Sequence, residues 1–127
     1  MKEVNFFKCE ICGNIIHFIV QAGPRIVCCG QGMKELIPGT VDASYEKHIP
    51  HVEISGDKMK VQIGAIIHPM TAEHYIAFIF VQTNKGGQIK YLSQGSDPVA
   101  EFNFADEKPV AVYEYCNLHG LWKAEVK

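Results

Sequence analysis

The chain contains 127 residues, 47% of them hydrophobic, which is enough to bury one core but not two of ordinary size. Its 12 basic and 14 acidic residues give a formal net charge of −2, and without a basic stripe the sequence argues against nucleic acid as a partner. The apolar runs are too short for a membrane span or a secretory signal, so we expect a cytoplasmic protein without membrane partners. Five cysteines, an odd number in a compartment that keeps thiols reduced, argue against a disulfide framework.

The first 36 residues contain four of the five cysteines, in a C-x-x-C-G knuckle and an adjacent pair followed by glycine: Cys9, Cys12, Cys28 and Cys29. Between the two cysteine pairs lie apolar runs at 15–20 and 25–27, separated by a Gly-Pro turn. We expect these runs to form short strands. A segment of this size seldom folds on a core of its own, and a metal held by four thiolates, iron or zinc, would supply the missing stability. The adjacent pair can bind one metal only if the backbone bends there, because successive side chains of an extended strand point apart. The alternative is a redox C-x-x-C or two reactive thiol pairs.

A Pro-Gly turn at 38–39 marks the boundary between two expected domains, residues 1–37 and 38–127. The second domain is patterned for β-structure throughout. From Met59 to Ala65 every second residue is apolar, as in a half-buried strand, whereas 76–81 is continuously apolar, as in a central buried strand. Alternation returns at 99–104, turn signals lie at 56–57 and 84–87, and no segment has a helical amphipathic pattern. Seven or so short strands therefore predict an all-β protein whose second domain is a β-sandwich, with an immunoglobulin-like arrangement as the candidate.

A thiol and an imidazole lie three residues apart in Cys116-Asn117-Leu118-His119-Gly120, on a Gly-terminated loop between apolar, β-prone flanks. Two donors do not complete a metal site, but three more histidines lie at expected loop or strand-edge positions, where sites are usually built: His48, His68 and His74. If these residues converge on the loop, the site has four imidazoles and one thiolate. That set has too many donors for tetrahedral zinc and exceeds the His2Cys set of blue copper. Iron with one open coordination position fits it best.

Each part of this ligand set has a simpler interpretation. A single histidine is more often a surface or core residue than a ligand, and we assign this role to His17 and His51. A copper electron carrier would also use a Cys-x-x-His loop on a β-sandwich, but it needs a methionine shortly after the histidine, and none follows His119. A zinc-binding interaction module built on the first four cysteines would leave Cys116 and the scattered histidines unused.

The motifs match those of a known family, in order and from end to end of the chain. They are Cys9-x-x-Cys12-Gly13, Cys28-Cys29-Gly30, Glu46-Lys47-His48-Ile49-Pro50, His68-Pro69-Met70, His74 and Cys116-Asn117-Leu118-His119-Gly120-Leu121-Trp122. On these residues the chain resembles desulfoferrodoxin, the two-iron form of superoxide reductase.

The resemblance implies a desulforedoxin-like domain with a four-cysteine iron, centre I, followed by an immunoglobulin-like catalytic domain with a second iron, centre II. At centre II it implies an axial thiolate from Cys116 and four equatorial imidazoles, from His48, His68, His74 and His119. It also implies reduction of superoxide to hydrogen peroxide in the cytoplasm of anaerobes or microaerophiles. A rubredoxin-like donor would supply the electrons, and the protein would be a homodimer.

Two charged residues beside His48 are the catalytic candidates. Lys47 has the sign needed to attract superoxide locally, and a positive charge about 4 Å from the anion contributes roughly 4 kcal/mol at an effective dielectric of about 20. Its expected effects are on the capture rate and on the orientation of a proton-donating water. Glu46 would repel superoxide, and the resemblance implies that it ligates the ferric iron after turnover. Taken singly, either residue could be a solvated surface charge.

Overall fold

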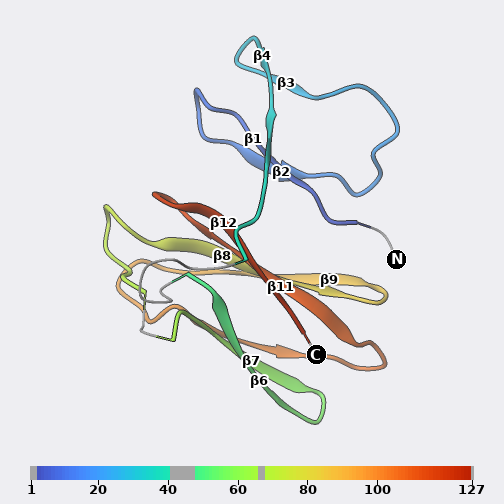
Figure 1. Cartoon of the computed structure of the whole chain (residues 1–127), viewed down its shortest axis with the longest axis vertical. Coiled ribbons are helices and arrows are strands. Elements are labelled where there is room, and N and C mark those ends of the chain that lie inside the picture. Colours follow the sequence, from blue (N-terminus) through green and yellow to red (C-terminus); the bar gives the residue numbers. More distant parts are fainter. Residues whose placement is uncertain (1–2, 41–47, 66–67, 127) are drawn as a thin grey trace. The chain divides into compact units, whose positions relative to one another are not determined.

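The structure is a computed structural model that describes residues 3–40, 48–65 and 68–126. In these residues the chain forms strands β1 to β12 and no helix, and it divides into two compact units, Met1–Ile37 and Pro38–Lys127 (Figure 1). The predicted all-β fold class is therefore confirmed. None of the described residues belongs to a helix long and apolar enough to cross a membrane.

Unit Met1–Ile37 contains two small antiparallel sheets. The first has the order β2-β1-β5 and the second pairs β3 with β4; the five strands are β1 (Phe6–Lys8), β2 (Ile15–His17), β3 (Val27–Cys28), β4 (Gln31–Gly32) and β5 (Lys34–Leu36). The buried cluster of this unit contains Phe7, Cys9 and Met33, with three partly buried neighbours, and Phe6 is buried as well. The strand predicted over 15–20 ends at His17, because β1 offers only three residues to pair with it. Ile19 and Val20 beyond it are each 73% exposed.

Unit Pro38–Lys127 is a β-sandwich of two antiparallel sheets, with orders β10-β7-β6 and β12-β11-β8-β9. Its strands are β6 (Pro50–Ser55), β7 (Lys58–Ile63), β8 (Ile76–Thr83), β9 (Gly86–Tyr91), β10 (Val99–Asn103), β11 (Pro109–Cys116) and β12 (Gly120–Glu125). Seven strands in the described part of this unit match the predicted number.

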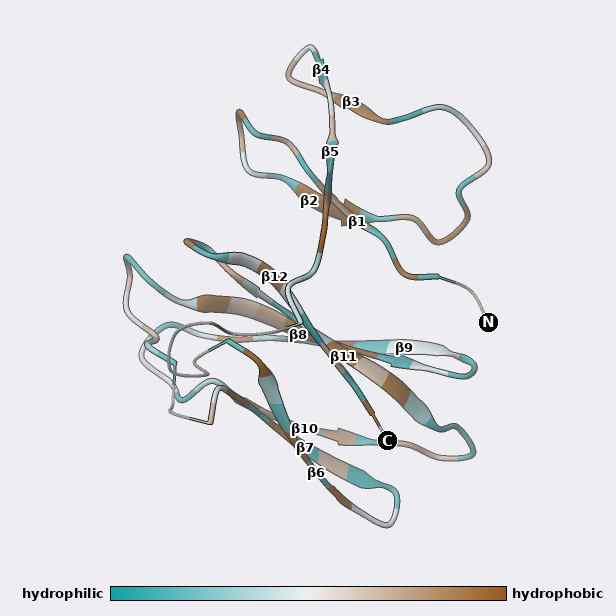
Figure 2. Ribbon diagram, in the orientation of Figure 1, coloured by the Kyte–Doolittle hydropathy of each residue, from teal (hydrophilic) through white to brown (hydrophobic). Residues whose placement is uncertain are grey.

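The core of the sandwich contains side chains from both sheets, among them Val61 of β7, Phe102 of β10 and Val112 of β11. These strands carry brown, hydrophobic residues in Figure 2, with polar residues between them. The alternation predicted from Met59 holds as far as Ile63 and is wrong for Ala65, which is exposed. Gly64 has φ +82 and turns the chain there, so the strand ends before Ala65 is reached.

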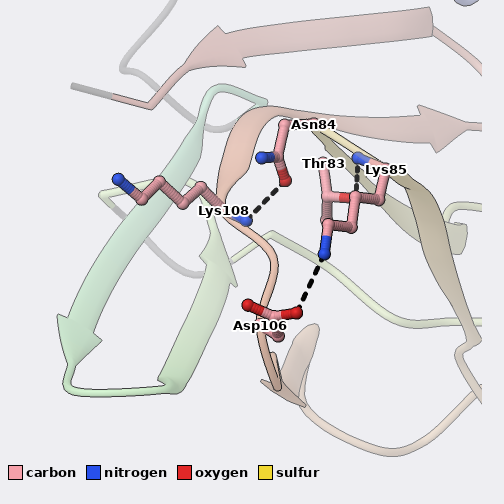
Figure 3. Close-up of polar contacts among 5 residues, drawn as sticks. All are labelled: Thr83, Asn84, Lys85, Asp106 and Lys108. Carbon is pink, nitrogen blue, oxygen red and sulfur yellow. Dashed lines mark hydrogen bonds and ion pairs between the residues drawn. The ribbon is translucent and has the colours of Figure 1, made fainter.

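The pairing of β8 with β11 defines the two ends of the sandwich, because it runs from Thr83 opposite Pro109 to Ile76 opposite Cys116. At the Thr83 end, the Oδ1 atom of Asn84 accepts a hydrogen bond from the Lys108 backbone N–H at 2.8 Å (Figure 3). Lys85 and Asp106 form an ion pair nearby, with 3.0 Å between Nζ and Oδ2. The Cys116 end is where the predicted ligands meet.

Candidate metal centres

Five side chains predicted to bind one metal converge at the Cys116 end of the sandwich. Each offers one donor atom, and these atoms all lie within 4.8 Å of one another: His48, His68, His74, Cys116 and His119. Strand ends place them. His48 precedes β6, His68 and His74 lie between β7 and β8, Cys116 ends β11, and His119 lies in the turn to β12. A spread of 4.8 Å is about twice a metal–ligand bond, so one ion can reach all five atoms.

The four imidazoles are arranged in a ring around one point, each beside two others. The ring centroids of successive pairs are 4.5 Å apart for His68 and His74, 4.7 Å for His48 and His119, 5.0 Å for His48 and His68, and 5.1 Å for His74 and His119. In each pair the rings are steeply inclined, by 62° to 78°. Four rings around one point are what four ligands in a square would require, as the resemblance implied for the equatorial positions.

Distances between donor atoms fit a single ion. The Nε2 atom of His48 lies 3.0 Å from Nδ1 of His119, and the Cys116 Sγ atom lies 3.7 Å from that Nδ1. Two nitrogen ligands at right angles, each bonded at about 2.1 Å, are about 3 Å apart. The two rings therefore present the nitrogens that one metal would bind.

His68 has the buried donor atom that most clearly calls for a metal. Its Nδ1–H donates a 2.7 Å hydrogen bond to the Pro69 carbonyl, which leaves the lone pair on Nε2. That Nε2 atom is buried and has no hydrogen-bond partner among the described residues. Burial, followed by the smaller effect of the neighbouring histidines, lowers the pKa of His68 to about 4, so the ring is neutral at pH 7 and can bind a cation.

The thiol of Cys116 is completely buried, and this burial raises its pKa. Hydrogen bonds from the backbone N–H groups of Leu118 and His119 act in the opposite direction, and the nearby Glu114 carboxylate raises the pKa further. The thiolate that could serve as a ligand is therefore stabilised by two N–H donors but still needs a cation to offset its burial.

Asn117 and Thr71 hold the segment that carries His74 in place through hydrogen bonds. Neither residue was assigned a role from the sequence. Asn117 accepts from the Tyr75 N–H at 2.8 Å through Oδ1 and donates to the Glu73 carbonyl at 2.9 Å through Nδ2. These bonds tie the Cys116–His119 turn to the segment that carries His74. Thr71 Oγ1 accepts from the His74 N–H at 3.1 Å. Short polar side chains inside ligand-bearing turns are the signal that could have indicated both roles.

The second cluster lies in unit Met1–Ile37 and comprises the four predicted cysteines. The Sγ atoms of Cys9, Cys12, Cys28 and Cys29 lie within 4.8 Å of one another, and all are free of disulfides. The Cys12 and Cys28 sulfurs are 3.6 Å apart, close to the roughly 3.8 Å expected between two sulfurs of a tetrahedral site with bonds of about 2.3 Å. The predicted bend at the adjacent pair is present, because Cys29 has φ +54.

The thiols of this cluster cannot all ionise without a cation. Hydrogen bonds from the Cys12 and Ile11 backbone N–H groups lower the pKa of Cys9 to about 6. By contrast, interactions with the Cys12 and Cys9 sulfurs raise the pKa of Cys28 and raise that of Cys29 to about 12. A cation bound by the four sulfurs would favour the thiolate form of each of them.

Four further residues were singled out from the sequence, and only two of them are among the described residues. Glu46 and Lys47, the catalytic candidates, lie outside the described residues. His17 is in β2, where its ring stacks on Phe6 with centroids 5.4 Å apart, and His51 is exposed in β6. Neither histidine is among the donor groups of the described residues.

Comparisons with known proteins agree with the geometry. Residues 40–125 match the family described as desulfoferrodoxin, and residues 1–36 match the desulfoferrodoxin N-terminal domain. The chain belongs to the desulfoferrodoxin family. The predicted resemblance is thus confirmed. The two donor clusters match the two iron centres of this family, so the cofactors are two iron ions.

Individual relatives support this membership over almost the whole chain. The desulfoferrodoxin of Nitratidesulfovibrio vulgaris is 42% identical over 98% of this chain and 98% of its own length. The crystal structure of the superoxide reductase from Treponema pallidum is similar with a TM-score of 0.85 and 37% identity, covering 97% of this chain and 98% of that one. The superoxide reductase of Pyrococcus horikoshii is 39% identical over 65% of this chain and 87% of its own length.

Proposed function

We propose that this desulfoferrodoxin is a superoxide reductase, which reduces superoxide to hydrogen peroxide at the cluster of four imidazoles and one thiolate. That cluster is the observation that carries the proposal, because it unites five donors on a rigid sandwich. Its iron ligands are His48, His68, His74, Cys116 and His119. Cys9, Cys12, Cys28 and Cys29 hold the second iron, in a domain of residues 1–37, and the catalytic domain comprises residues 38–127.

An iron ion held by these five donors would supply one electron to each superoxide, and two protons would complete the conversion to hydrogen peroxide. The five protein donors are one fewer than the six positions of octahedral coordination, which leaves room for a small anion. Among the donors, His119 is exposed and the others are buried or half-buried, so the cluster reaches solvent through its edge. Cys116 contributes a strongly donating sulfur, which in haem proteins favours chemistry at bound oxygen.

Lys47 and Glu46 are the two charged residues of the proposed mechanism. The ammonium of Lys47 would draw superoxide towards the site and orient a proton-donating water, and the Glu46 carboxylate would be a ligand to the oxidised ion. Support comes from their position directly before His48. Lys47→Ala is expected to slow superoxide capture about tenfold and to flatten its salt dependence. Pulse radiolysis across ionic strength measures both; Lys60→Ala, in an exposed lysine of β7, is the control. Equal rates and slopes in both variants would remove Lys47 from the mechanism.

A rubredoxin-like protein is the proposed electron donor. Its identity is tested by measuring which reduced carriers become oxidised when they are mixed with the oxidised protein. The proposed assembly is a homodimer formed by unit Met1–Ile37. Its support is exposed apolar side chains in that unit, with Ile19 and Val20 each 73% and Val27 65% exposed. Sedimentation of the native protein and of Ile19→Lys tests it, and a monomeric native protein would refute it.

The proposed location is the cytoplasm, where free thiols persist and thiolate sites can load their metal. Fractionation of the source cells tests this point.

Metal content combined with superoxide-dependent oxidation is the experiment that tests the activity itself. The expected result is two irons per chain, a coloured ferric form, and stoichiometric oxidation of the reduced second iron by superoxide with formation of hydrogen peroxide. One copper per chain, or colourless zinc without superoxide consumption, would replace the proposal with a copper carrier or a zinc-binding module.

A further inference from the structure

Trp122 stacks directly on the His48 ring, one of the four imidazoles of the histidine cluster. The centroids of its ring and that of His48 are 4.7 Å apart, and the two planes are inclined by only 12°. Trp122 lies in β12, three residues after His119, and it is the one tryptophan of the chain. A single aromatic side chain thus connects β12 with His48, which precedes β6.

The indole is in turn backed by Gly39. A methyl group at Gly39 would lie 2.7 Å from both Cε3 and Cζ3 of Trp122, a separation that real side chains do not tolerate. The Gly39 N–H donates to the Leu121 carbonyl at 2.9 Å, and the Lys123 N–H donates to the Gly39 carbonyl at 2.9 Å. These two hydrogen bonds hold the Gly39 backbone against the strand on both sides of Trp122. The close approach therefore requires glycine.

The polar atom of Trp122 takes no part in this arrangement. Its Nε1 atom is buried and has no hydrogen-bond partner among the described residues. A buried indole N–H usually finds a partner, and leaving it without one is unfavourable. Among the described residues, contact of the flat ring with Gly39 and His48 defines the place of the indole.

We propose that Trp122 is a positioning residue for centre II, and that it fixes the plane of the His48 ring so that Nε2 points into the donor cluster. The inference rests on the proposed ligand set. Stacking restricts the tilt of the imidazole, and the 3.0 Å approach to His119 Nδ1 restricts its rotation within the plane. Partners that orient a metal ligand are typically worth tenfold to a hundredfold in metal affinity. Gly39 is part of the device, because any larger side chain would displace the indole.

The chain contains a matched control for this packing. Phe80 of β8 lies against Gly87 of β9, where an added methyl group would lie 2.8 Å from Cε1 of the phenyl ring. Phe80 is 7% exposed, and the centroid of its ring lies 6.2 Å from that of Tyr113. Substitutions in this pair disturb an aromatic-on-glycine contact of the same sandwich, and neither residue is one of the five donors.

The experiment compares Trp122→Leu and Gly39→Ala with Phe80→Leu and Gly87→Ala in the full-length, iron-loaded protein. The readouts are the rate of ferrous iron loss from centre II to a chelator, the visible absorption of its ferric form, and the midpoint of thermal unfolding. We expect iron loss to accelerate about tenfold or more in the first two variants, with a shifted absorption band. The two controls should lower the unfolding midpoint while iron loss stays within about twofold of the native rate.

Trp122→Phe separates a role in orientation from a role in packing, because phenylalanine keeps a flat ring and loses only size. We expect it to restore most of the native retention of iron. Equal iron loss in Trp122→Leu and Phe80→Leu, or no rescue by phenylalanine, would overturn the inference. A native protein that lacked the second iron would instead refute the proposed ligand set, so the two failures are distinguishable. Trp122→Phe and Gly39→Ala keep the test decisive even if Trp122→Leu does not fold.

Discussion

The two metal clusters are built on opposite plans. In unit Met1–Ile37 four donor groups of one type come from a short stretch of chain with four buried hydrophobic residues, and one of these, Cys9, is itself a donor. In unit Pro38–Lys127 the donor groups come from three separate segments at one end of a sandwich with its own extensive core. The thiolate cluster takes the place of a core, whereas the histidine cluster depends on one. Metal binding should therefore be coupled to folding in the first unit and to chemistry in the second.

Replacing Cys116 by serine is the substitution with the largest expected effect. It removes the one sulfur of the histidine cluster from a fully buried position at the end of β11. Loss of partners outside the ligand set already costs 10-fold to 100-fold, so we expect superoxide reduction to fall by more than about a hundredfold. The thiolate-to-iron absorption band should disappear, while the sandwich stays folded. Stopped-flow kinetics and absorption spectra measure both effects. Retention of the band and of the activity would reject Cys116 as a ligand.

Cys12→Ser makes the same substitution in the four-cysteine cluster of unit Met1–Ile37. The variant should lose the four-cysteine iron and most of the protection of unit Met1–Ile37 against proteolysis, because that unit has little core without its metal. Superoxide oxidation of the reduced second iron should remain within about twofold of the native rate, since the sandwich has its own core. Iron content, limited proteolysis and pulse radiolysis test these points. A folded variant that keeps its second iron but cannot reduce superoxide would show that the thiolate cluster takes part in the reaction.

Acid should weaken the histidine cluster through His68. Its pKa in the folded chain is about 4 against an ordinary value of 6.5, so between these values the unfolded chain binds a proton that the folded chain does not. Stability from this residue is therefore complete above pH 6.5 and is lost as pH falls towards 4, by up to roughly 3 kcal/mol. Protonation also competes with iron in the same direction.

Denaturant unfolding of the iron-free protein at pH 7 and pH 4.5 measures this contribution. His68→Gln removes the titrating group and keeps a polar side chain of similar reach, so the native protein should lose more stability on acidification than the variant does. Parallel losses in the two proteins would mean that His68 does not set the acid sensitivity.

Much of the site could be predicted because ligand chemistry is local in sequence. Cys116 and His119 share one turn, and the Cys12 knuckle is recognisable from four residues. The bend at Cys29 followed from geometry alone, since two adjacent thiols cannot face one metal from an extended strand. The number of strands in the sandwich could likewise be counted from alternation and turn signals.

What could not be predicted depends on contacts between distant segments. The strand after Ile15 stops at His17 because its neighbour β1 is short, and Ala65 is exposed because Gly64 turns the chain. The contact of Trp122 with His48 joins residues 74 positions apart, and no periodicity in either segment indicates it. Pattern identifies donors, whereas the residues that orient them emerge only from the assembled sandwich.

The smallest expected effect lies at the end of the sandwich away from the ligands. Asn84→Ala removes the 2.8 Å hydrogen bond to the Lys108 N–H at an exposed turn, which should lower the free energy of unfolding by about 1 kcal/mol. Asn103→Ala is the control, because the exposed Asn103 side chain makes no hydrogen bond to the described residues. Iron content and superoxide kinetics should be native in both variants, since β8 and β11 separate this turn from the cluster by their full length. A change in iron retention on removing the Asn84 side chain would show that the core transmits strain along the sandwich. The turn at Asn84 and the histidine cluster would then not be independent of each other.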